Sequence, residues 1–524
     1  MSGSRYGDAG PPTSTRRTVR RLNHPNPLWG SNGVAFGPDG RLHVAQFLAG
    51  RISAVDVASG DVEVIVPEDG PVRSPDDLAF GADGSMYITD LVPGRVWRRS
   101  PLGEFSLVTD QVSVPNGITC VGDRLFVNEM KPGGRLLELF PDGGDPVVLA
   151  DDLAMGNAMQ LGPDGCLYYP HMLTNRVYRV PVDGGEPELV AEDVHEPVAV
   201  RFDLGGVFLV LSRGAAGIVT RFDLFGTGDR SIVTSGVVGL DNAAFDGENR
   251  MFVSSFASGG IAEMRPDGQT RDVVPQGFDG PFGVTVDLGG TVYAADHYRL
   301  ATPSGQDGGV RTLELLTFVH GIAADRGVLH LTSQYGDVRT HDPATGTTRV
   351  RASRLDQPMG IAVREDGSLV VAETGAGRVL LIDADDVVTV LADGLDHPVD
   401  VALDAEQRCY VSDDRLGTVF RLADGAPEVV AEGLDGPQGL AVRGQALLVV
   451  ETGSRRLVAI DLASGEVGIE AENLAVDPPP RGETGLFAGG MPGVPSWFAG
   501  VAVGPDGSAY VAATGEGSVV RVSR

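Results

Sequence analysis

Short side chains that carry oxygen recur at one position of a repeated pattern in the first half of the chain. The position lies just ahead of an apolar run, as in PNGITC at 115–120. A lone asparagine there can satisfy its own backbone as a turn residue. Several of them at one centre gather amide and carboxylate oxygens, which need either a cation or a water network in a polar channel. Hard divalent cations prefer such oxygens, with Ca²⁺ as the first expectation and Mg²⁺ or Mn²⁺ as the second. The candidate cation ligands are Asn32, Asp76, Asn116, Asn157 and Asp241.

A second set of polar side chains ends the strand that follows each of these positions. Glu129 and His171 are expected to lie beside Asn116 and Asn157, and Asp90 takes the same place one repeat earlier. A carboxylate or an imidazole near a bound cation can act as general acid or base. It can equally serve as a hydrogen-bond partner that orients the asparagines. The sequence leaves both roles open, so Glu129, His171 and Asp90 are candidate catalytic residues.

These side chains must be positioned by a repeat of about 40 residues, which occurs twelve times. The segment SPDDLAFGADGSMYITDLVPGRVWRRS (74–100) shows the pattern of an apolar strand, a DG turn, an alternating strand and a third strand. A fourth strand follows. Four short strands repeated radially are typical of β-propeller blades, whose first strands line a central channel. We predict an all-β chain of two six-bladed β-propellers in tandem, because the alternative of one open solenoid leaves exposed edges.

The repeats set the expected domain boundaries. Residues 1–15 are predicted to be a disordered tail, 16–279 the first propeller and 280–524 the second. The last repeat stops after its third strand, and residues 16–22 look like an unpaired fourth strand. They either close the last blade of the second propeller or pair within the first. Insertions at 296–309 and 477–498 are expected on the mouth face of the second propeller, as a lid or as packing between the propellers.

The second propeller has mostly apolar residues where the first has oxygens. Phe282, Met359 and Val399 stand at the corresponding strand starts. An apolar mouth with an acidic rim fits a small organic ligand without a metal. The polar groups of this alternative substrate-binding site are His320, Glu373, Asp413 and Glu451.

Composition excludes several classes of function. The chain has 524 residues, 42% of them apolar, and a net charge of −30, which disfavours nucleic acid and anionic membranes as partners. Cys120, Cys166 and Cys409 lack the spacing of a disulfide framework or a thiolate zinc site. Without an apolar signal region or a run of 18 apolar residues, the chain is expected to be soluble and cytoplasmic, unless an export signal has been removed. No obligate protein partner is indicated.

The segments PNGITCVGDRLFVNEM (115–130) and QPMGIAVREDGSLVVAETGAGRVLLID (357–383) resemble repeats of the gluconolactonase and regucalcin family and of NHL-type propellers. The resemblance implies a calcium or other divalent ion at the channel mouth and hydrolysis of lactones or phosphoesters. Asn116, Asn157 and Asp241 match that style of ligand. The chain departs from the family at its first blade, where Asn32 replaces a glutamate, and in having two propellers. Strictosidine synthase, a further relative, uses the same fold without a metal.

Three functions follow from the sequence. The first is a metal-dependent hydrolase of a lactone or ester at the mouth of the first propeller. The second is a metal-free lyase, cyclase or isomerase at the apolar mouth of the second propeller. The third is a non-catalytic binding scaffold. In the first two the partner is a small organic molecule, and fold resemblance alone does not decide among the three.

Overall fold

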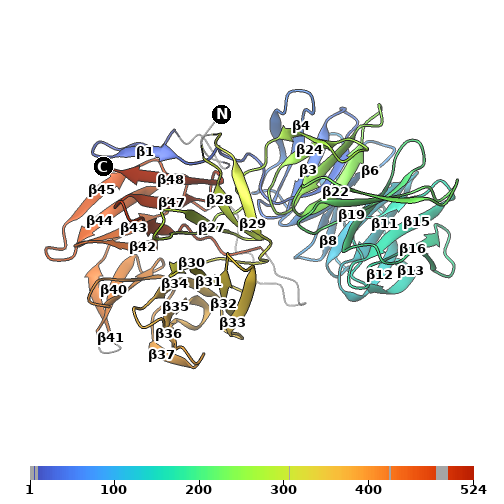
Figure 1. Ribbon diagram of the computed structural model, residues 1–524. Coiled ribbons are helices and arrows are strands. Elements are labelled where there is room, and N and C mark those ends of the chain that lie inside the picture. Colours follow the sequence, from blue (N-terminus) through green and yellow to red (C-terminus); the bar gives the residue numbers. More distant parts are fainter. Residues whose placement is uncertain (1–4, 6–9, 306, 424–425, 479–493) are drawn as a thin grey trace. The chain divides into compact units, whose positions relative to one another are not determined.

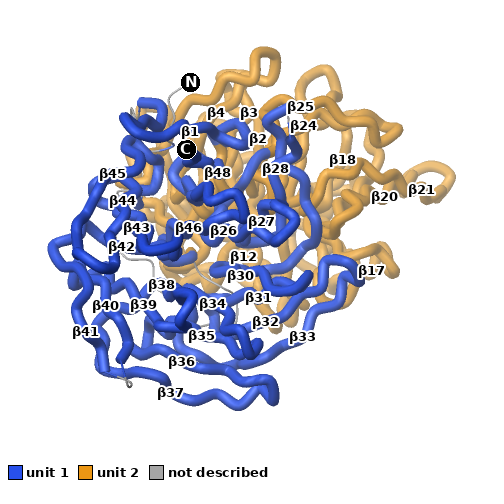
Figure 2. The backbone as a smooth tube through the Cα atoms, turned by 60° about the vertical axis from the view of Figure 1, so that its left-hand side comes forward, with its two compact units in different colours: residues 1–27, 277–479, 495–524 blue, residues 28–276, 480–494 orange. Residues whose placement is uncertain are grey.

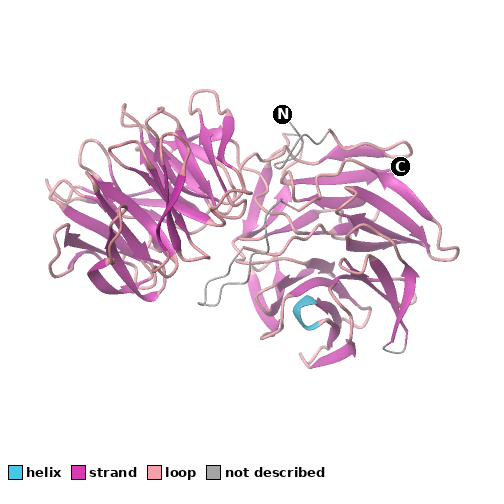
Figure 3. Cartoon of the chain, turned by 180° about the vertical axis from the view of Figure 1, so that it is seen from behind, coloured by secondary structure: helices cyan, strands magenta, loops and turns pink. Residues whose placement is uncertain are grey.

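Strands dominate the structure, a computed structural model that describes residues 5, 10–305, 307–423, 426–478 and 494–524. The helices within these residues amount to one short 3-10 turn, η1 (Thr374–Ala376) (Figure 3). None of them has the length and apolar character needed to cross a membrane. The strands form twelve four-stranded sheets, as expected for propeller blades (Figure 1). The predicted all-β class and the twelve repeats are therefore confirmed.

The chain divides into two compact units, coloured separately in Figure 2. Unit 2 comprises Leu28–Gln276 and Pro480–Val494, and unit 1 comprises Met1–Pro27, Gly277–Pro479 and Pro495–Arg524. Each unit holds six of the twelve sheets. Unit 2 is thus inserted in the sequence of unit 1. The divisions fall after residues 27 and 276, whereas we predicted them after residues 15 and 279.

In unit 2 every sheet takes its four strands in chain order. The six sheets are β2 (Ser31–Phe36), β3 (Leu42–Gln46), β4 (Arg51–Val55) and β5 (Val62–Val66); β6 (Pro75–Phe80), β7 (Met86–Asp90), β8 (Arg95–Arg99) and β9 (Phe105–Thr109); β10 (Pro115–Val121), β11 (Arg124–Glu129), β12 (Pro132–Leu139) and β13 (Val147–Ala154); β14 (Gln160–Leu161), β15 (Cys166–His171), β16 (Arg176–Pro181) and β17 (Glu188–Ala191); β18 (Pro197–Phe202), β19 (Phe208–Ser212), β20 (Ile218–Phe222) and β21 (Arg230–Thr234); β22 (Leu240–Phe245), β23 (Met251–Ser255), β24 (Ile261–Met264) and β25 (Thr270–Val274).

In unit 1 five sheets follow the same order, and the sixth takes its outer strand from the start of the chain. The sheets are β26 (Gly283–Val286), β27 (Val292–Asp296), β28 (Arg299–Pro303) and β29 (Val310–Glu314); β30 (Ile322–Asp325), β31 (Val328–Ser333), β32 (Asp337–Asp342) and β33 (Thr347–Ala352); β34 (Pro358–Val363), β35 (Leu369–Glu373), β36 (Arg378–Ile382) and β37 (Val388–Ala392); β38 (Pro398–Leu403), β39 (Cys409–Asp413), β40 (Thr418–Ala423) and β41 (Ala426–Ala431); β42 (Pro437–Arg443), β43 (Ala446–Glu451), β44 (Arg456–Asp461) and β45 (Val467–Ala471); β46 (Val501–Val503), β47 (Ala509–Ala513), β48 (Ser518–Ser523) and β1 (Thr18–Arg21).

The first strands of the six sheets contact one another in a closed cycle within each unit. In unit 2 the cycle runs through β2, β6, β10, β14, β18 and β22 and returns to β2. In unit 1 it runs through β26, β30, β34, β38, β42 and β46 and returns to β26. Residues at the start of these strands therefore belong to one ring in each unit.

A glycine directly after the ring position lets neighbouring first strands approach closely. A Cβ atom at Gly117 would overlap the carbonyl oxygen of Asn157, and one at Gly33 would overlap Asp77. These glycines have ordinary backbone angles, so space, and not conformation, requires them. This explains the pair Asn116–Gly117 at the start of β10. Asn116 is directed to the centre of the unit, and Gly117 has no side chain that would collide with the neighbouring first strand.

Apolar side chains fill the space between adjacent sheets, so that the core is divided into clusters. One cluster in unit 2 joins Leu209 and Leu211 of β19 to Ala243 of β22 and Val253 of β23. These residues alternate along their strands with residues that face the other side, as the pleat requires. Packing against neighbouring sheets thus holds each first strand at the centre of its unit.

The strand β1 closes the last sheet of unit 1. Val19 pairs with Val522 of β48 in antiparallel register and packs on the cluster between the last two sheets. Arg21 forms an ion pair with Glu516 at 2.7 Å. Of the two arrangements open for residues 16–22, the structure has the one that completes the last blade.

Three other predicted segments differ from expectation. The stretch 296–309 is not an insertion, because it contains β28, the third strand of its sheet. The predicted tail includes Arg5, which is buried and donates to the carbonyl groups of Asn26 and Asp279, and Thr13, which pairs with Glu472. Of the insertion at 477–498, residues 479–493 lie outside the described part of the chain.

Removing residues 1–22 should destabilise unit 1, since β48 loses the four residue pairs of its ladder with β1. At about 1 kcal/mol for each hydrogen bond, together with the burial of Val19, we expect a loss of roughly 3–5 kcal/mol. Hydrogen exchange followed by mass spectrometry should show lower protection in β46–β48 and unchanged protection in unit 2. A synthetic peptide of residues 10–23 should restore it. Equal protection in the truncated and full chains would contradict the closure.

Candidate functional site

The six side chains at the starts of the first strands of unit 2 form a cluster that we name the polar mouth. Its central member is Asp76, which is 5% exposed. Asn32 donates its amide N–H to Oδ1 of Asp76 at 3.0 Å, and Asn116 donates to Oδ2 at 2.6 Å. The structure thus brings together residues that are 40 or more positions apart in sequence. The members are Asn32, Asp76, Asn116, Asn157, Val198 and Asp241.

Two methionines connect Asn157 to the rest of the polar mouth. The amide nitrogen of Asn157 lies 3.3 Å from Sδ of Met172 and 3.5 Å from Sδ of Met130. The same Met130 sulfur lies 3.0 Å from the amide nitrogen of Asn116. Because a thioether is a weak acceptor, these amide N–H groups are held loosely. The weak contacts concern the amide nitrogens: Asn116 also donates to Asp76 at 2.6 Å, and the amide oxygen of Asn157 accepts the N–H of Ala158 at 2.7 Å.

Burial and mutual repulsion disfavour ionisation of the carboxylates of the polar mouth. Burial, followed by the negative charge of Asp77, raises the pKa of Asp76 to about 7, against the hydrogen bond from Asn32. Burial, followed by the charges of Asp76 and Asp77, raises the pKa of Asp241 well above its ordinary value. Two carboxyl groups in one desolvated place are stabilised by a proton or by a cation. The polar mouth consequently favours added positive charge.

A second polar layer lies one residue further along the first strands, and sequence reasoning missed it. Asp77 accepts hydrogen bonds from the backbone N–H of Leu78 at 2.9 Å and from the amide of Asn242 at 3.1 Å. Arg201 donates to Asn242 Oδ1 and to the carbonyl oxygen of Ala243. Its positive charge acts on Asp77 and Asp241. The chain therefore supplies one cation of its own beneath the polar mouth, and the tandem Asp76–Asp77 pair was the signal available in the sequence.

Glu129 does not lie beside Asn116 as we predicted, because Met130, the next residue, takes that place. Glu129 is buried and accepts a hydrogen bond from the backbone N–H of Ser113 at 2.9 Å. Arg135 pairs with it at 2.6 Å. We name this arrangement the acid brace. In it an acid at the end of the second strand binds the backbone before the first strand and, in four sheets, also an arginine on the third strand.

The burial of Glu129 alone would raise its pKa. The hydrogen bonds from Arg135 and Ser113 and the charges of Arg135 and Lys131 outweigh burial and hold the pKa of Glu129 below its ordinary value. The group is therefore ionised and fully engaged at neutral pH. Its hydrogen bonds within the described residues go to Ser113 and Arg135, the partners of the acid brace.

The same acid brace recurs in unit 1 at three residues that we predicted to bind substrate. Glu373 accepts the N–H of Asp356 and pairs with Arg378. Glu451 accepts the N–H of Asp435 and pairs with Arg456. Asp413 accepts the N–H groups of two loop residues and has no arginine partner. These bonds occupy the carboxylates, so the prediction that they form a substrate-binding rim is not supported.

Asp90 and His171 also lie away from the predicted positions. Asp90 accepts bonds from the N–H and hydroxyl groups of Ser74 and from the indole of Trp97. The ring of His171 packs on Tyr178, 4.4 Å between centroids. Burial lowers the pKa of His171 to about 4, so the imidazole is neutral near pH 7. Within the described chain, neither residue has a hydrogen bond to the polar-mouth side chain of its own sheet, which is Asp76 for Asp90 and Asn157 for His171.

In unit 1 the residue at the equivalent ring position, His320, is covered. Its ring stacks between Phe282 at 4.6 Å and Phe498 at 5.4 Å. Its Nε2 donates to the carbonyl oxygen of Ser496 at 3.0 Å, an assignment that follows because a carbonyl only accepts. Gln438 receives the backbone N–H of Ala499. The described end of the predicted 477–498 insertion therefore lies against this mouth.

The donor set of the polar mouth decides which ions it fits. Among the residues that the structure describes, no group of three or more His, Cys, Asp or Glu side chains could hold a metal ion. The polar mouth has two carboxylates, Asp76 and Asp241, and three asparagine amides. Such a set lacks the soft ligands of zinc or copper and resembles the oxygen sets that bind Ca²⁺.

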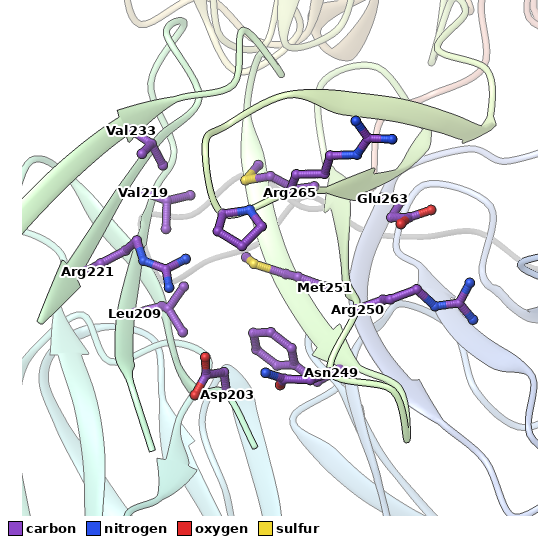
Figure 4. Close-up of a pocket in the computed structure, with 13 residues that line it drawn as sticks. Asp203, Leu209, Val219, Arg221, Val233, Asn249, Arg250, Met251, Glu263 and Arg265 are labelled. Atoms are coloured by element: carbon purple, nitrogen blue, oxygen red, sulfur yellow. The ribbon is translucent and has the colours of Figure 1, made fainter. Parts of the chain in front are cut away.

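Two cavities lined by described residues lie apart from the predicted site. One of about 140 Å³ lies between the fifth and sixth sheets of unit 2, lined by Leu209, Val219 and Met251 with Arg221 and Asp203 nearby (Figure 4). It lies at the ends of β19 and β22 opposite to Ser212 and Asp241. A smaller one of about 40 Å³ lies at the centre of unit 1 beside Asp400. None of the predicted site residues lines either cavity.

Comparison with known proteins gives the following. No family model matches the chain, and no curated protein matches it. Among solved structures, a streptogramin B lyase is 20% identical, covering 53% of this chain and 94% of that one, with a TM-score of 0.39. A gluconolactonase from Xanthomonas campestris is 18% identical, covering 48% and 93%, with a TM-score of 0.38. The calcium-binding protein regucalcin from Agrobacterium tumefaciens is 19% identical, covering 45% and 85%, with a TM-score of 0.37.

Replacing Glu129 with glutamine should lower stability and leave the polar mouth unchanged. The Glu129→Gln variant weakens charged hydrogen bonds to Arg135 and Ser113, and we expect the free energy of unfolding of unit 2 to fall by about 2–3 kcal/mol. Denaturant unfolding measures this loss, and calcium titration of the folded variant should match the wild type. Glu373→Gln is the matched variant in unit 1 and should behave alike. A large loss of calcium affinity with full stability would contradict the brace.

The raised pKa of Asp76, from an ordinary 3.8 to about 7, makes stability depend on pH. Between these values the folded state binds more protons than the unfolded state, so stability falls as pH rises through the window. In chelator, the melting temperature of unit 2 should fall more from pH 5 to pH 8 in the wild type than in Asp76→Asn. Calcium should raise it more at pH 8 than at pH 5, because protons compete. Equal calcium effects at both pH values would refute this.

Proposed function

We propose that each unit is a six-bladed β-propeller and that unit 2 is a cation-dependent hydrolase of a lactone or ester, acting at the polar mouth. The closed cycle of first strands supports the propeller assignment. One observation carries the function: Asp76 and Asp241 are buried together among three asparagine amides, with their pKa values raised. A site built only for stability gains nothing from two repelling carboxylates.

The cation would be held by the carboxylates of Asp76 and Asp241 and by the amide oxygens of Asn32, Asn116 and Asn157. The two carboxylates balance the charge of a divalent ion, and Ca²⁺ tolerates an irregular set of oxygens better than Mg²⁺ or Mn²⁺ does. When bound, such an ion polarises the carbonyl of a scissile ester or lactone. To direct its amide oxygen at the ion, Asn116 would exchange its hydrogen bond to Asp76, and Asn157 would exchange the bond it accepts from Ala158.

The residues of the polar mouth also provide proton transfer and partial exclusion of water. A bound cation would favour the ionised form of Asp241, and a carboxylate oxygen of that residue would then be suited to accept the proton of an attacking water. Val198, Met130 and Met172 are buried apolar neighbours of the same ring. They lower the local dielectric, which strengthens electrostatic interactions with the substrate carbonyl.

A metal-free lyase in unit 1 has less support. The carboxylates that it would use, Glu373 and Glu451, are engaged in acid braces, and His320 is covered by Phe498 and Ser496. A non-catalytic scaffold differs from the hydrolase in its expected result, which is cation binding without turnover of any lactone or ester.

Calcium removal and ligand substitution test the hydrolase. After dialysis against a chelator, hydrolysis of a panel of lactones should be lost and should return on addition of Ca²⁺. Asn157→Ala should weaken Ca²⁺ binding at least about tenfold, which corresponds to about 1.4 kcal/mol for one lost ligand. Asn249→Ala, an exposed asparagine at the other end of its sheet, is the matched control and should bind normally. Turnover that survives exhaustive chelation would eliminate the proposal.

A further inference from the structure

A second circle of six residues surrounds the polar mouth. Each of them is the residue directly after the second strand of its sheet. Its backbone N–H donates a hydrogen bond to a carbonyl oxygen just before the first strand, that of the residue two positions ahead of the polar-mouth residue. For example, Met130 bonds to Val114, which precedes Asn116, and Arg213 bonds to Glu196, which precedes Val198. The six residues are Phe47, Leu91, Met130, Met172, Arg213 and Phe256.

Five of these residues are apolar and the sixth is an arginine. The apolar five are each at most 9% exposed. The sulfur contacts of Met130 and Met172 with Asn116 and Asn157 show that side chains of this circle lie against the ring. Arg213 is half-buried at the equivalent place of the fifth sheet. The circle is therefore an apolar wall with a single guanidinium group.

The surroundings of Arg213 leave its guanidinium group without a fixed partner. Among the residues that the structure describes, it forms no ion pair and no hydrogen bond, and it lies 5.8 Å from the ring centroid of Phe256. The ring residue of its own sheet is Val198, which offers no oxygen. The charge of Arg213 acts on Asp241, but the two side chains form no ion pair or hydrogen bond within the described residues. Most other arginines at the ends of second or third strands are paired, as Arg135 and Arg378 are.

An arginine held in this way matches a planar anion. A guanidinium group binds a carboxylate through two parallel hydrogen bonds and stays charged at all physiological pH values. A cation at the polar mouth and Arg213 on the wall would together bind a molecule with two oxygen functions, one at each place. The apolar side chains of Met130, Met172 and Phe256 are suited to contact the carbon skeleton between them.

We propose that the ligand of unit 2 carries a carboxylate that Arg213 binds, so that the substrate is an acidic lactone or ester and not a neutral one. The assignment of a lactone or ester substrate rests on the proposed function. The binding of the carboxylate to Arg213 can be measured without turnover. Arg213 is then a specificity-determining residue, placed opposite the reacting carbonyl.

The proposal is tested by the binding of two small molecules that the protein cannot hydrolyse, one with a carboxylate and one with an amide in its place. Calorimetric titration in saturating Ca²⁺ compares cyclopentanecarboxylate with cyclopentanecarboxamide, which have the same shape. We expect the wild type to bind the carboxylate about 10–100-fold more tightly, as charge-assisted bidentate pairs do. Arg213→Gln should abolish this preference, and Arg213→Lys should retain part of it. Arg221→Gln, at the far cavity of the same unit, is the control and should keep the full preference.

The outcomes separate this inference from the hydrolase. A preference that persists in Arg213→Gln would mean that the carboxylate binds elsewhere, and the inference would be wrong. A preference that depends on Arg213 in a protein that hydrolyses no lactone supports the inference and removes the hydrolase. Hydrolysis of a carboxylate lactone and of its amide at equal kcat/KM removes the inference and keeps the hydrolase. Melting curves of each variant check that it is folded.

Discussion

The close approach of the first strands at the centre of each unit is the constraint on which the sites depend. Glycines such as Gly117 and Gly321 leave no room for a side chain between neighbouring first strands. The residues at the ring positions of one unit, whether or not a glycine follows them, then share a small central space. Whatever is encoded at those positions is forced together, regardless of its separation along the chain.

The two units apply this constraint to different residues. In unit 2 it gathers Asp76, Asp241 and asparagine amides, whose lone pairs and charges require a counter-ion or protons. In unit 1 the same positions hold His320 between Phe282 and Phe498, a stacked apolar cluster that needs neither. One backbone arrangement thus yields a centre with two buried carboxylates and another that is filled by stacked side chains.

The acid brace explains why acidic residues at strand ends are poor guides to catalysis in this chain. Glu129, Glu373 and Glu451 each bind a backbone N–H before the first strand and an arginine on or near the third. A buried carboxylate with these partners ties three strands of a sheet together. Its role in each sheet is to hold the first strand in register, which in turn positions the ring residue.

The fold could be predicted from the sequence, whereas the site could be predicted only in part. The repeat, its DG turns and the four strands for each repeat are local patterns, and they placed Asn32 through Asp241 at equivalent positions. Which residue at the end of a second strand meets the ring depends on the pleat, and an error of one residue exchanges the faces. This is why Glu129 was expected where Met130 lies. Arg201 and Arg213 escaped notice because long side chains reach across sheets in ways that alignment of repeats does not show.

The most direct test of the central claim is an anomalous-difference map from crystals of the protein grown with Mn²⁺ in place of Ca²⁺. The account predicts one strong peak in unit 2 within bonding distance of carboxylate oxygens of Asp76 and Asp241 and of amide oxygens of the neighbouring asparagines. It predicts no peak at the mouth of unit 1. A map without density between Asp76 and Asp241 at saturating Mn²⁺, or with the ion bound elsewhere, would contradict it.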